Sequence, residues 1–203
     1  MRLLHKPGLT LLVALLAACG SDITLDPLPR GAVVLAFGDS LTYGTGAAPG
    51  RSYPDVLSDM TGLRIVNAGV PGETTTKGLT RLPEALDEFN PDLVILIHGG
   101  NDMLRRQSRS GAAANLTRMI ELSRDSGAEV VMLAVPAPGL ILSPAAFYGE
   151  VAENTGTPID TDALADILQY PSNKADPIHP NAAGYRMLAE RVEDLLKETG
   201  ALH

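Results

Sequence analysis

The sequence predicts an α/β domain in which a parallel β-sheet lies between layers of helices. Apolar runs of the kind found in strands covered on both faces occur four times, and segments typical of helices separate them. Strands that alternate with helices favour a parallel sheet. A chain of 203 residues has the length of one such domain, so we expect a single core.

The four apolar runs are expected to form strands of this sheet. The first run is apolar at every position, which is the pattern of a strand buried on both faces. The runs span residues 32–37, 64–66, 93–97 and 129–135. Three helices are expected between them, over residues 53–61, 75–89 with a kink at Pro83, and 110–126.

The last helix has the clearest pattern in the chain. Its apolar side chains recur at spacings of three and four, so they share one face of the helix. These residues are Tyr185, Leu188, Ala189, Val192, Leu195 and Leu196. Asn181 can cap the first turn and Gly200 can end the last, so we expect the helix between these two residues.

The first residues have the features of an export signal. Arg2 and Lys6 precede an apolar run over residues 9–16, and small residues follow it. Positive, apolar and small-residue regions in this order are typical of a signal peptide. The run is shorter than the ~20 apolar residues of a permanent membrane helix. We therefore expect residues 1–18 to be a signal peptide that is removed.

Residues 16–19, Leu-Ala-Ala-Cys, resemble the lipobox of bacterial lipoproteins. The resemblance implies that Cys19, the only cysteine, is acylated and becomes the mature N-terminus. We then expect residues 19–30 to tether a domain of residues 31–203 to a bacterial membrane, facing the periplasm or the cell surface. The alternative is a secreted protein without a lipid, in which a cysteine happens to follow the cleavage site.

Charge and composition argue against several classes of partner. The net charge is −8 and no basic cluster is present, whereas nucleic acid binding needs a basic face. Five tyrosines, three phenylalanines and no tryptophan leave few stacking surfaces for bases or flat cofactors. One cysteine and four scattered histidines show no metal-ligand spacing. We therefore expect no nucleic acid, no metal and no cofactor.

Polar residues of the kinds used in catalysis follow the expected strands. Ser40 follows the first strand, Gly72 lies in the loop after the second, and Asn101 follows the third. Asp176 and His179 lie just before the last helix. Ligand sites in open parallel sheets lie beyond the carboxyl ends of the strands, so these residues are expected to meet at one edge.

Together these residue types predict serine-dependent hydrolysis of an ester through an acyl-enzyme. A serine hydroxyl is a poor nucleophile until an imidazole takes its proton, and a carboxylate fixes the tautomer of that imidazole. Ser40, His179 and Asp176 can fill these three roles. Attack on an ester creates an oxyanion, which the backbone N–H groups of Ser40 and Gly72 and the side-chain amide of Asn101 can stabilise.

These blocks resemble the GDSL, or SGNH, hydrolase family. Residues 67–74 read Asn-Ala-Gly-Val-Pro-Gly-Glu-Thr and residues 99–102 read Gly-Gly-Asn-Asp, as in small bacterial arylesterases, thioesterases and lysophospholipases. The resemblance implies a flavodoxin-like three-layer α/β/α sandwich with a five-stranded parallel sheet in the order 2-1-3-4-5. It also implies the same site, which consists of Ser40, Asp176 and His179 as triad and Ser40, Gly72 and Asn101 as oxyanion donors.

The sequence is also compatible with two other functions. One is a carbohydrate O-deacetylase on the same fold. The other is a non-catalytic, flavodoxin-like lipoprotein that binds an anion or a flavin with Ser40, Thr42 and Thr45. That second function leaves Asp176 and His179 without a role, so a small-molecule or lipid ester, or a thioester, is the expected substrate.

The long, proline-rich stretch over residues 136–175 is expected to shape the substrate pocket. A long excursion in a compact domain is typical of a functional segment. Two short helices are expected in it, over residues 145–153 and 162–169. Its apolar residues either line an acyl pocket or cover the sheet. His98, at the end of the third strand, either lines the same pocket or packs in the core. The apolar residues are Leu140, Ile141, Leu142, Ala145, Phe147 and Tyr148.

Overall fold

In the computed structural model of the protein, five parallel strands form one sheet. The structure describes residues 23–139 and 142–202. The strand order is β2-β1-β3-β4-β5, and every neighbouring pair is parallel. The expected order and direction are therefore confirmed. The strands are β1 (Val33–Gly38), β2 (Arg64–Gly69), β3 (Leu93–Ile97), β4 (Glu129–Leu133) and β5 (Ile159–Asp160).

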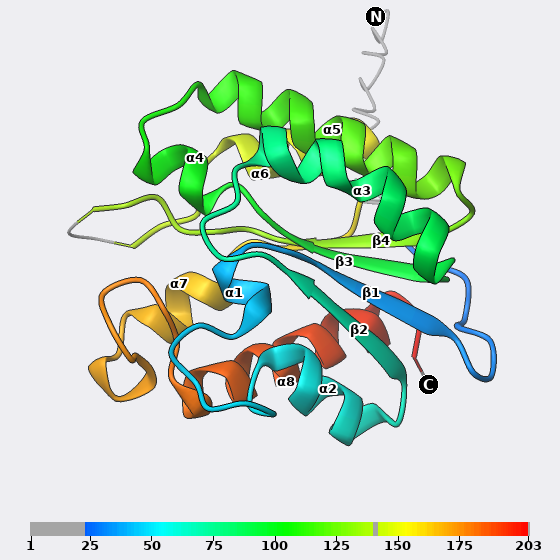
Figure 1. Cartoon of the computed structure of the whole chain (residues 1–203), viewed down its shortest axis with the longest axis horizontal. Coiled ribbons are helices and arrows are strands. Elements are labelled where there is room, and N and C mark those ends of the chain that lie inside the picture. Colours follow the sequence, from blue (N-terminus) through cyan, green and yellow to red (C-terminus); the bar gives the residue numbers. More distant parts are fainter. Residues whose placement is uncertain (1–22, 140–141, 203) are drawn as a thin grey trace, which may run out of the picture.

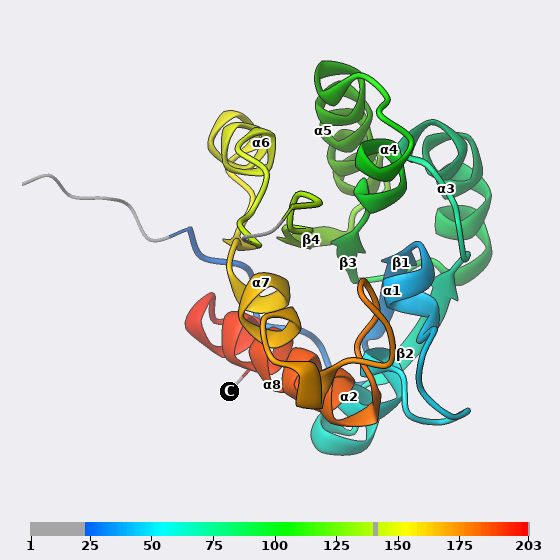
Figure 2. The same cartoon turned by 90° about the vertical axis from the view of Figure 1, so that its left-hand side faces the viewer.

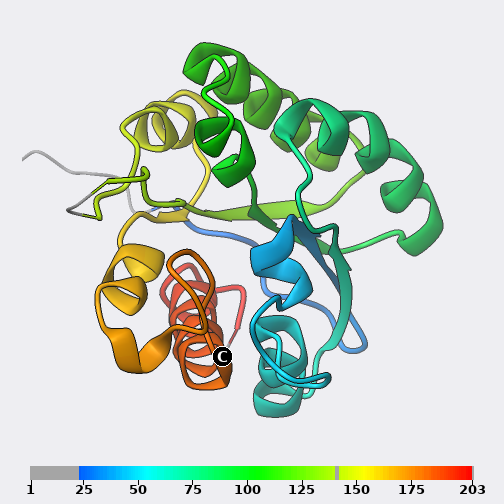
Figure 3. The ribbon, with the colours of Figure 1, turned by 60° about the vertical axis from the view of Figure 1, so that its left-hand side comes forward.

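Helices cover both faces of the sheet, which gives the expected three-layer α/β/α sandwich (Figures 1 and 3). One face carries α3 (Thr75–Phe89), α5 (Arg109–Asp125) and α6 (Phe147–Thr155). The other carries α2 (Tyr53–Thr61), α7 (Ala163–Leu168) and α8 (Ala182–Glu198). The expected bounds of α2 and α3 are confirmed, and α3 continues through Pro83.

Burial explains why the central strands lack polar alternation. Every residue of β3 is buried, because helices lie above and below it. The edge strand β2 is partly exposed and includes the polar residues Arg64 and Asn67. The centre of the core therefore lies on β1, β3 and β4, and Ser40 and Asn101 follow two of these buried strands.

Side-chain caps fix the starts of the helices that flank the site. Ser52 and Asp55 form a capping box at the start of α2. The Asn181 side chain accepts hydrogen bonds from the N–H groups of Ala183 and Gly184, so the expected cap of α8 is confirmed. Gly200 follows α8 with a φ of +84°, a left-handed conformation that favours glycine.

Four short elements have no counterpart among the residue ranges expected from the sequence pattern, although the resemblance implied a fifth strand. They are too short to show a helical or strand period. They are α1 (Ser40–Tyr43), α4 (Gly100–Leu104), β5 and the 3-10 turn Pro171–Asn173. Two of them, α1 and α4, carry residues of the site.

The segment before β1 packs against the folded domain. The Leu25 side chain is 8% exposed and belongs to the core. Its N–H donates to the Thr199 carbonyl at 2.8 Å, and the N–H of Leu28 donates to that of Ala201 at 3.0 Å. Apolar side chains in the expected tether therefore anchor it beside the end of α8.

The expected signal peptide and Cys19 lie outside the described residues. Within residues 23–139 and 142–202, no helix has the length and apolar character needed to cross a membrane.

Candidate active site

Ser40 lies at the start of α1, directly after the central strand β1. The Asp39 side chain caps α1 by accepting a hydrogen bond from the Leu41 N–H at 3.0 Å. A side chain at Gly38 would collide with the Ile97 carbonyl, so glycine is needed where β1 passes β3 and turns. Figure 2 views the carboxyl ends of the strands, where α1 meets the loop before α8.

His179 connects Ser40 to Asp176 through both of its ring nitrogens. Nε2 lies 3.0 Å from the Ser40 Oγ, and Nδ1 lies 2.7 Å from the Asp176 Oδ2. A carboxylate beside Nδ1 favours the tautomer in which Nδ1 carries the proton and Nε2 has a free lone pair. The structure therefore brings the expected triad residues together in the expected order.

The Asp176 carboxylate is held by its own loop. Its Oδ1 accepts the backbone N–H groups of Ile178 at 2.9 Å and His179 at 2.8 Å. Burial raises the pKa of Asp176, but the bonds from the His179 ring and the two N–H groups outweigh it, so the pKa lies below its ordinary value. Asp176 thus stays charged beside the imidazole. Its side chain is 43% exposed, and contact with water also favours the charged form.

Contacts from α8 and from a glycine turn hold the Ser40 and His179 segments together. The Tyr185 hydroxyl donates to the Thr45 carbonyl at 2.8 Å. Gly46 has a φ of +99°, and a Cβ on it would lie 2.6 Å from the Pro180 carbonyl oxygen. A residue other than glycine would push this turn away from the loop that carries His179.

Gly72 and Asn101 line the same pocket as Ser40. Gly72 has a φ of +76°, a left-handed conformation that favours glycine. The Asn101 Nδ2 donates to the Asp39 Oδ2 at 3.0 Å, and an amide nitrogen has a second hydrogen for another acceptor. Burial raises the pKa of Asp39 more than bonds from Leu41 and Asn101 lower it.

Asp102, the neighbour of Asn101, has a structural role. Its Oδ2 accepts the Thr75 N–H at 2.9 Å, and its Oδ1 accepts the Thr75 hydroxyl at 2.7 Å. It thereby caps α3, whose own N-cap residue Thr74 makes no side-chain cap. The Gly-Gly-Asn-Asp block therefore places Gly100 and Asn101 at the pocket and Asp102 under the neighbouring helix.

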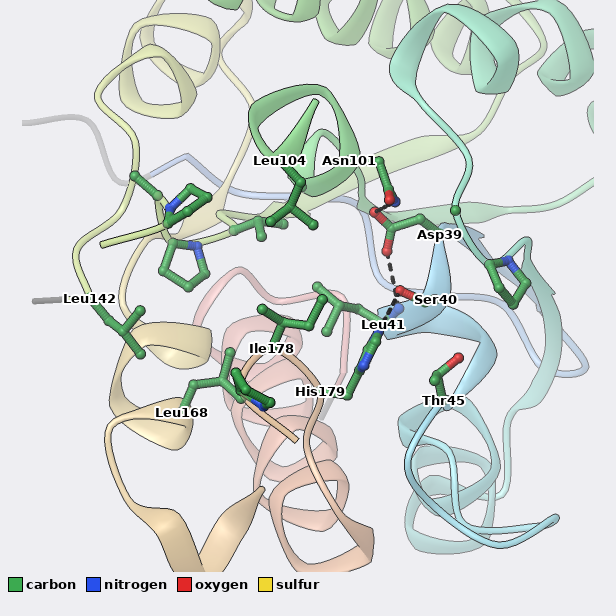
Figure 4. A pocket seen from close by; sticks show the side chains of 18 residues that line it. Asp39, Ser40, Leu41, Thr45, Asn101, Leu104, Leu142, Leu168, Ile178 and His179 are labelled. Atoms are coloured by element: carbon green, nitrogen blue, oxygen red, sulfur yellow. Dashed lines mark hydrogen bonds between the residues drawn. The ribbon is translucent and has the colours of Figure 1, made fainter. Parts of the chain in front are cut away.

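A pocket of about 260 Å³ opens beside Ser40. In Figure 4, its labelled leucines and Ile178 lie on one side of Ser40, and Thr45 lies on the other. Leu142 lines it, as expected, whereas Leu140 and Ile141 lie outside the described residues. The other large apolar residues of the wall were not predicted to line it, and Leu41 and Leu104 lie in helices too short to show a pattern. The apolar side chains of the wall are Leu41, Leu104, Val135, Leu142, Leu168 and Ile178.

The expectation that Phe147, Tyr148 and His98 line the pocket is wrong. Phe147 stacks on Tyr148 with ring centroids 4.2 Å apart, and both are buried in the core. The Tyr148 hydroxyl donates to the His98 carbonyl at 2.7 Å, and the His98 side chain is fully buried. Because α6 folds back onto the sheet, Phe147 and Tyr148 cover it, which was the alternative for this segment, and His98 packs at the end of β3.

A serine, a histidine and a carboxylate in series at the carboxyl edge of a parallel sheet define a serine hydrolase. Within the described residues, no group of three or more His, Cys, Asp or Glu side chains is placed to hold a metal ion. The chain belongs to the GDSL-like lipase/acylhydrolase family, which it matches over residues 36–187.

Relatives with assigned names support this class. An arylesterase of Vibrio mimicus is 33% identical over 176 residues, which cover 81% of this chain and 88% of that protein. The esterase TesA of Pseudomonas aeruginosa is 30% identical over 194 residues, which cover 90% of this chain and 96% of that protein. A crystal structure of TesA matches with a TM-score of 0.76 at 30% identity, over 82% of this chain and 99% of that one. These relatives favour neither a carbohydrate deacetylase nor a flavin-binding protein.

Proposed function

We propose that the chain hydrolyses carboxylic esters or thioesters through an acyl-enzyme on Ser40. The observation that carries this proposal is the series of short contacts from Asp176 through His179 to Ser40. Nε2 of His179 takes the hydroxyl proton as the Ser40 Oγ bonds to the ester carbonyl carbon. The protonated His179 then gives that proton to the leaving alkoxide or thiolate, and the acyl group stays on Ser40.

Water completes the reaction by the same route. His179 takes a proton from a water molecule as its oxygen attacks the acyl-enzyme, and returns the proton to Ser40 as the acid leaves. Each attack places negative charge on the former carbonyl oxygen. The N–H groups of Ser40 and Gly72 and the second Nδ2 hydrogen of Asn101 are the donors proposed for it.

The substrate class that we propose is an ester or thioester with an acyl chain or aryl group. The apolar side chains beside Ser40 support this choice, because a sugar site would need more hydrogen-bonding groups. The pocket volume of about 260 Å³ lies just below the ~300–1,000 Å³ of drug-sized ligand sites, which suits a short or medium chain. Thr42 is fully buried, which counts against an anion cradle of Ser40, Thr42 and Thr45.

The experiment is a series of p-nitrophenyl esters from acetate to decanoate, with wild type and Ser40→Ala. We expect Ser40→Ala to lose turnover to near background with an unchanged melting temperature. In wild type, kcat/KM should rise by up to about fourfold per methylene until the pocket is filled, since each buried CH₂ contributes ~0.8 kcal/mol. Preference for acetate throughout would contradict the acyl pocket and favour a deacetylase.

Two variants test the pocket wall. Leu104 is 46% exposed and lines the pocket, whereas Met187 is 38% exposed and lies on α8 away from it. Leu104→Ala should lower kcat/KM for octanoate more than for acetate. Met187→Ala should leave the ratio of these two values unchanged.

We also propose that the protein is exported and lipid-anchored through Cys19. Residues 1–19, with their signal-peptide pattern and lipobox-like end, support this proposal. Cys19→Ser should leave unprocessed precursor and abolish labelling by a fatty acid, while the enzymatic activity survives. Processed but unlabelled wild-type protein would contradict the anchor and leave the hydrolase intact.

A further inference from the structure

The turn that carries Gly72 has little packing around it. The Val70 N–H donates to the Gly38 carbonyl at 3.0 Å, and the Glu73 N–H donates to the Val70 carbonyl at 3.1 Å, which closes the turn. A Cβ built on Gly72 would meet only one group within 4 Å outside its chain neighbours, the Arg105 guanidinium at 3.6 Å. Val70 and Pro71 are exposed. On its solvent side the turn therefore rests on Arg105.

Arg105 directly follows α4, the short helix that carries Asn101, as its C-cap residue. Its backbone N–H donates to the Asn101 carbonyl at 3.0 Å at the end of α4. Its side chain crosses to the turn, where Nη2 donates to the Gly72 carbonyl at 2.8 Å. A single residue thus connects the segments of two proposed oxyanion donors.

The same two segments are connected a second time, on the buried side. Asp102 of α4 binds the N–H and hydroxyl of Thr75, three residues beyond Gly72. This buried link fixes α4 against the start of α3, but Gly72 lies outside it. The peptide unit after Gly72 is therefore held at two points, at its N–H by the Val70 carbonyl within the turn and at its carbonyl by the exposed link from Arg105.

We infer that Arg105 is a positioning residue, which holds Gly72 so that its N–H and the Asn101 amide point at one oxyanion. The inference rests on the proposed function, because it needs an oxyanion at that place. Donors of this kind act by being fixed before the charge appears, and a misplacement of about 1 Å can cost ~10²-fold in rate. Water can replace part of an exposed bond, so we expect removal of the guanidinium to lower kcat about tenfold.

The test compares Arg105→Ala and Arg105→Met with Arg109→Ala. Met keeps the apolar stem and loses the donors, whereas Arg109→Ala removes the same charge at the start of α5, outside the pocket lining. Both Arg105 variants should lose about tenfold in kcat with less than twofold change in KM and an unchanged melting temperature. Arg109→Ala should stay within twofold of wild type. Their affinity for a trifluoromethyl ketone, which forms a tetrahedral adduct with serine, should fall by the same factor as kcat/KM.

Each outcome decides the inference. Wild-type kcat in Arg105→Met, or an equal loss in Arg109→Ala, would overturn it even if Ser40→Ala is inactive. An unchanged affinity for the ketone would overturn it as well. If Ser40→Ala keeps wild-type turnover, the proposed function fails, and the role of Arg105 fails with it.

Discussion

The molecule has two carboxylate–histidine pairs, one in the core and one at the active site. Glu73 lies 3.2 Å from the His98 Nε2, and Asp176 lies 2.7 Å from the His179 Nδ1. The second nitrogen of His98 accepts the Gly99 N–H at 3.0 Å, so both nitrogens have partners within the fold. The second nitrogen of His179 faces the Ser40 hydroxyl at the pocket. The partner of the second nitrogen distinguishes a packing histidine from a reactive one.

The carboxylates of the two pairs, Glu73 and Asp176, also differ in the groups that hold them. Burial raises the pKa of Glu73, but bonds from His98 and Arg81 outweigh it and bring the pKa to about 2. Arg81 binds both Glu73 oxygens, at 3.0 and 2.7 Å, and its guanidinium lies 4.1 Å from the Phe37 ring centroid. Asp176 depends on N–H groups of its own loop. The first pair connects the start of α3 to the end of β3. In the second pair, His179 faces the Ser40 hydroxyl and can take its proton.

Removal of the His179 imidazole should have the largest effect on activity. His179→Ala should lower kcat by ~10⁴-fold or more, because the base for Ser40 is lost, and should leave the melting temperature unchanged. The measurement is turnover of a p-nitrophenyl ester alongside thermal unfolding. A variant that keeps more than a few per cent of wild-type turnover would remove His179 from the mechanism.

Replacing the exposed carboxylate should give the next largest effect. Asp176→Asn removes the negative charge that favours the reactive tautomer of His179, so kcat should fall by about 10³-fold. KM should change little, since the pocket wall is untouched. Steady-state kinetics on the same ester decide this, and a loss below tenfold would show that the loop N–H groups orient His179 without the charge.

His98→Ala should reverse the pattern of His179→Ala. The fully buried ring fills space against α3, where a Cβ on Gly78 would lie 2.4 Å from its Nε2, and it partners a buried carboxylate. We expect a loss of ~2–4 kcal/mol in the free energy of unfolding, measured in urea, with kcat of the folded enzyme within tenfold of wild type. Full stability with lost activity would place His98 in the catalytic machinery.

The pH dependence of stability should also report on the buried pair, through Glu73. Its folded pKa of about 2 lies below the ordinary value of 4.5. Its charge therefore stabilises the fold above pH 4.5, and this contribution is lost as the pH falls from 4.5 toward 2. Glu73→Gln should be less stable than wild type at pH 6, and the difference should shrink toward pH 2.5. Glu121→Gln, in an exposed pair with Arg118, should show little difference at any pH.

The sequence was sufficient to place Asp176 and His179 at the site. It was not sufficient to show that His98, which pairs with Glu73, lies away from the pocket. Ser40, Asn101 and His179 follow strong strand patterns or precede a strong helix pattern, so their meeting at one edge could be predicted. His98 ends a strand that is buried on both faces. Such a strand shows no polar alternation, so the pattern does not tell which way its last side chain points. Phe147 has the same ambiguity, because only the path of α6 decides which surface it covers.

Part of the pocket wall is built from segments other than those that carry Ser40 and Gly72, whereas Leu41 lies on α1 beside Ser40. Leu104 ends α4, Leu142 lies on a loop closed by the bridge between Pro136 and Pro144, and Leu168 ends α7. Ser40 and Gly72 follow β1 and β2 instead. Chain-length preference can therefore diverge among descendants of this sequence through loop exchanges, while the reaction itself is inherited unchanged.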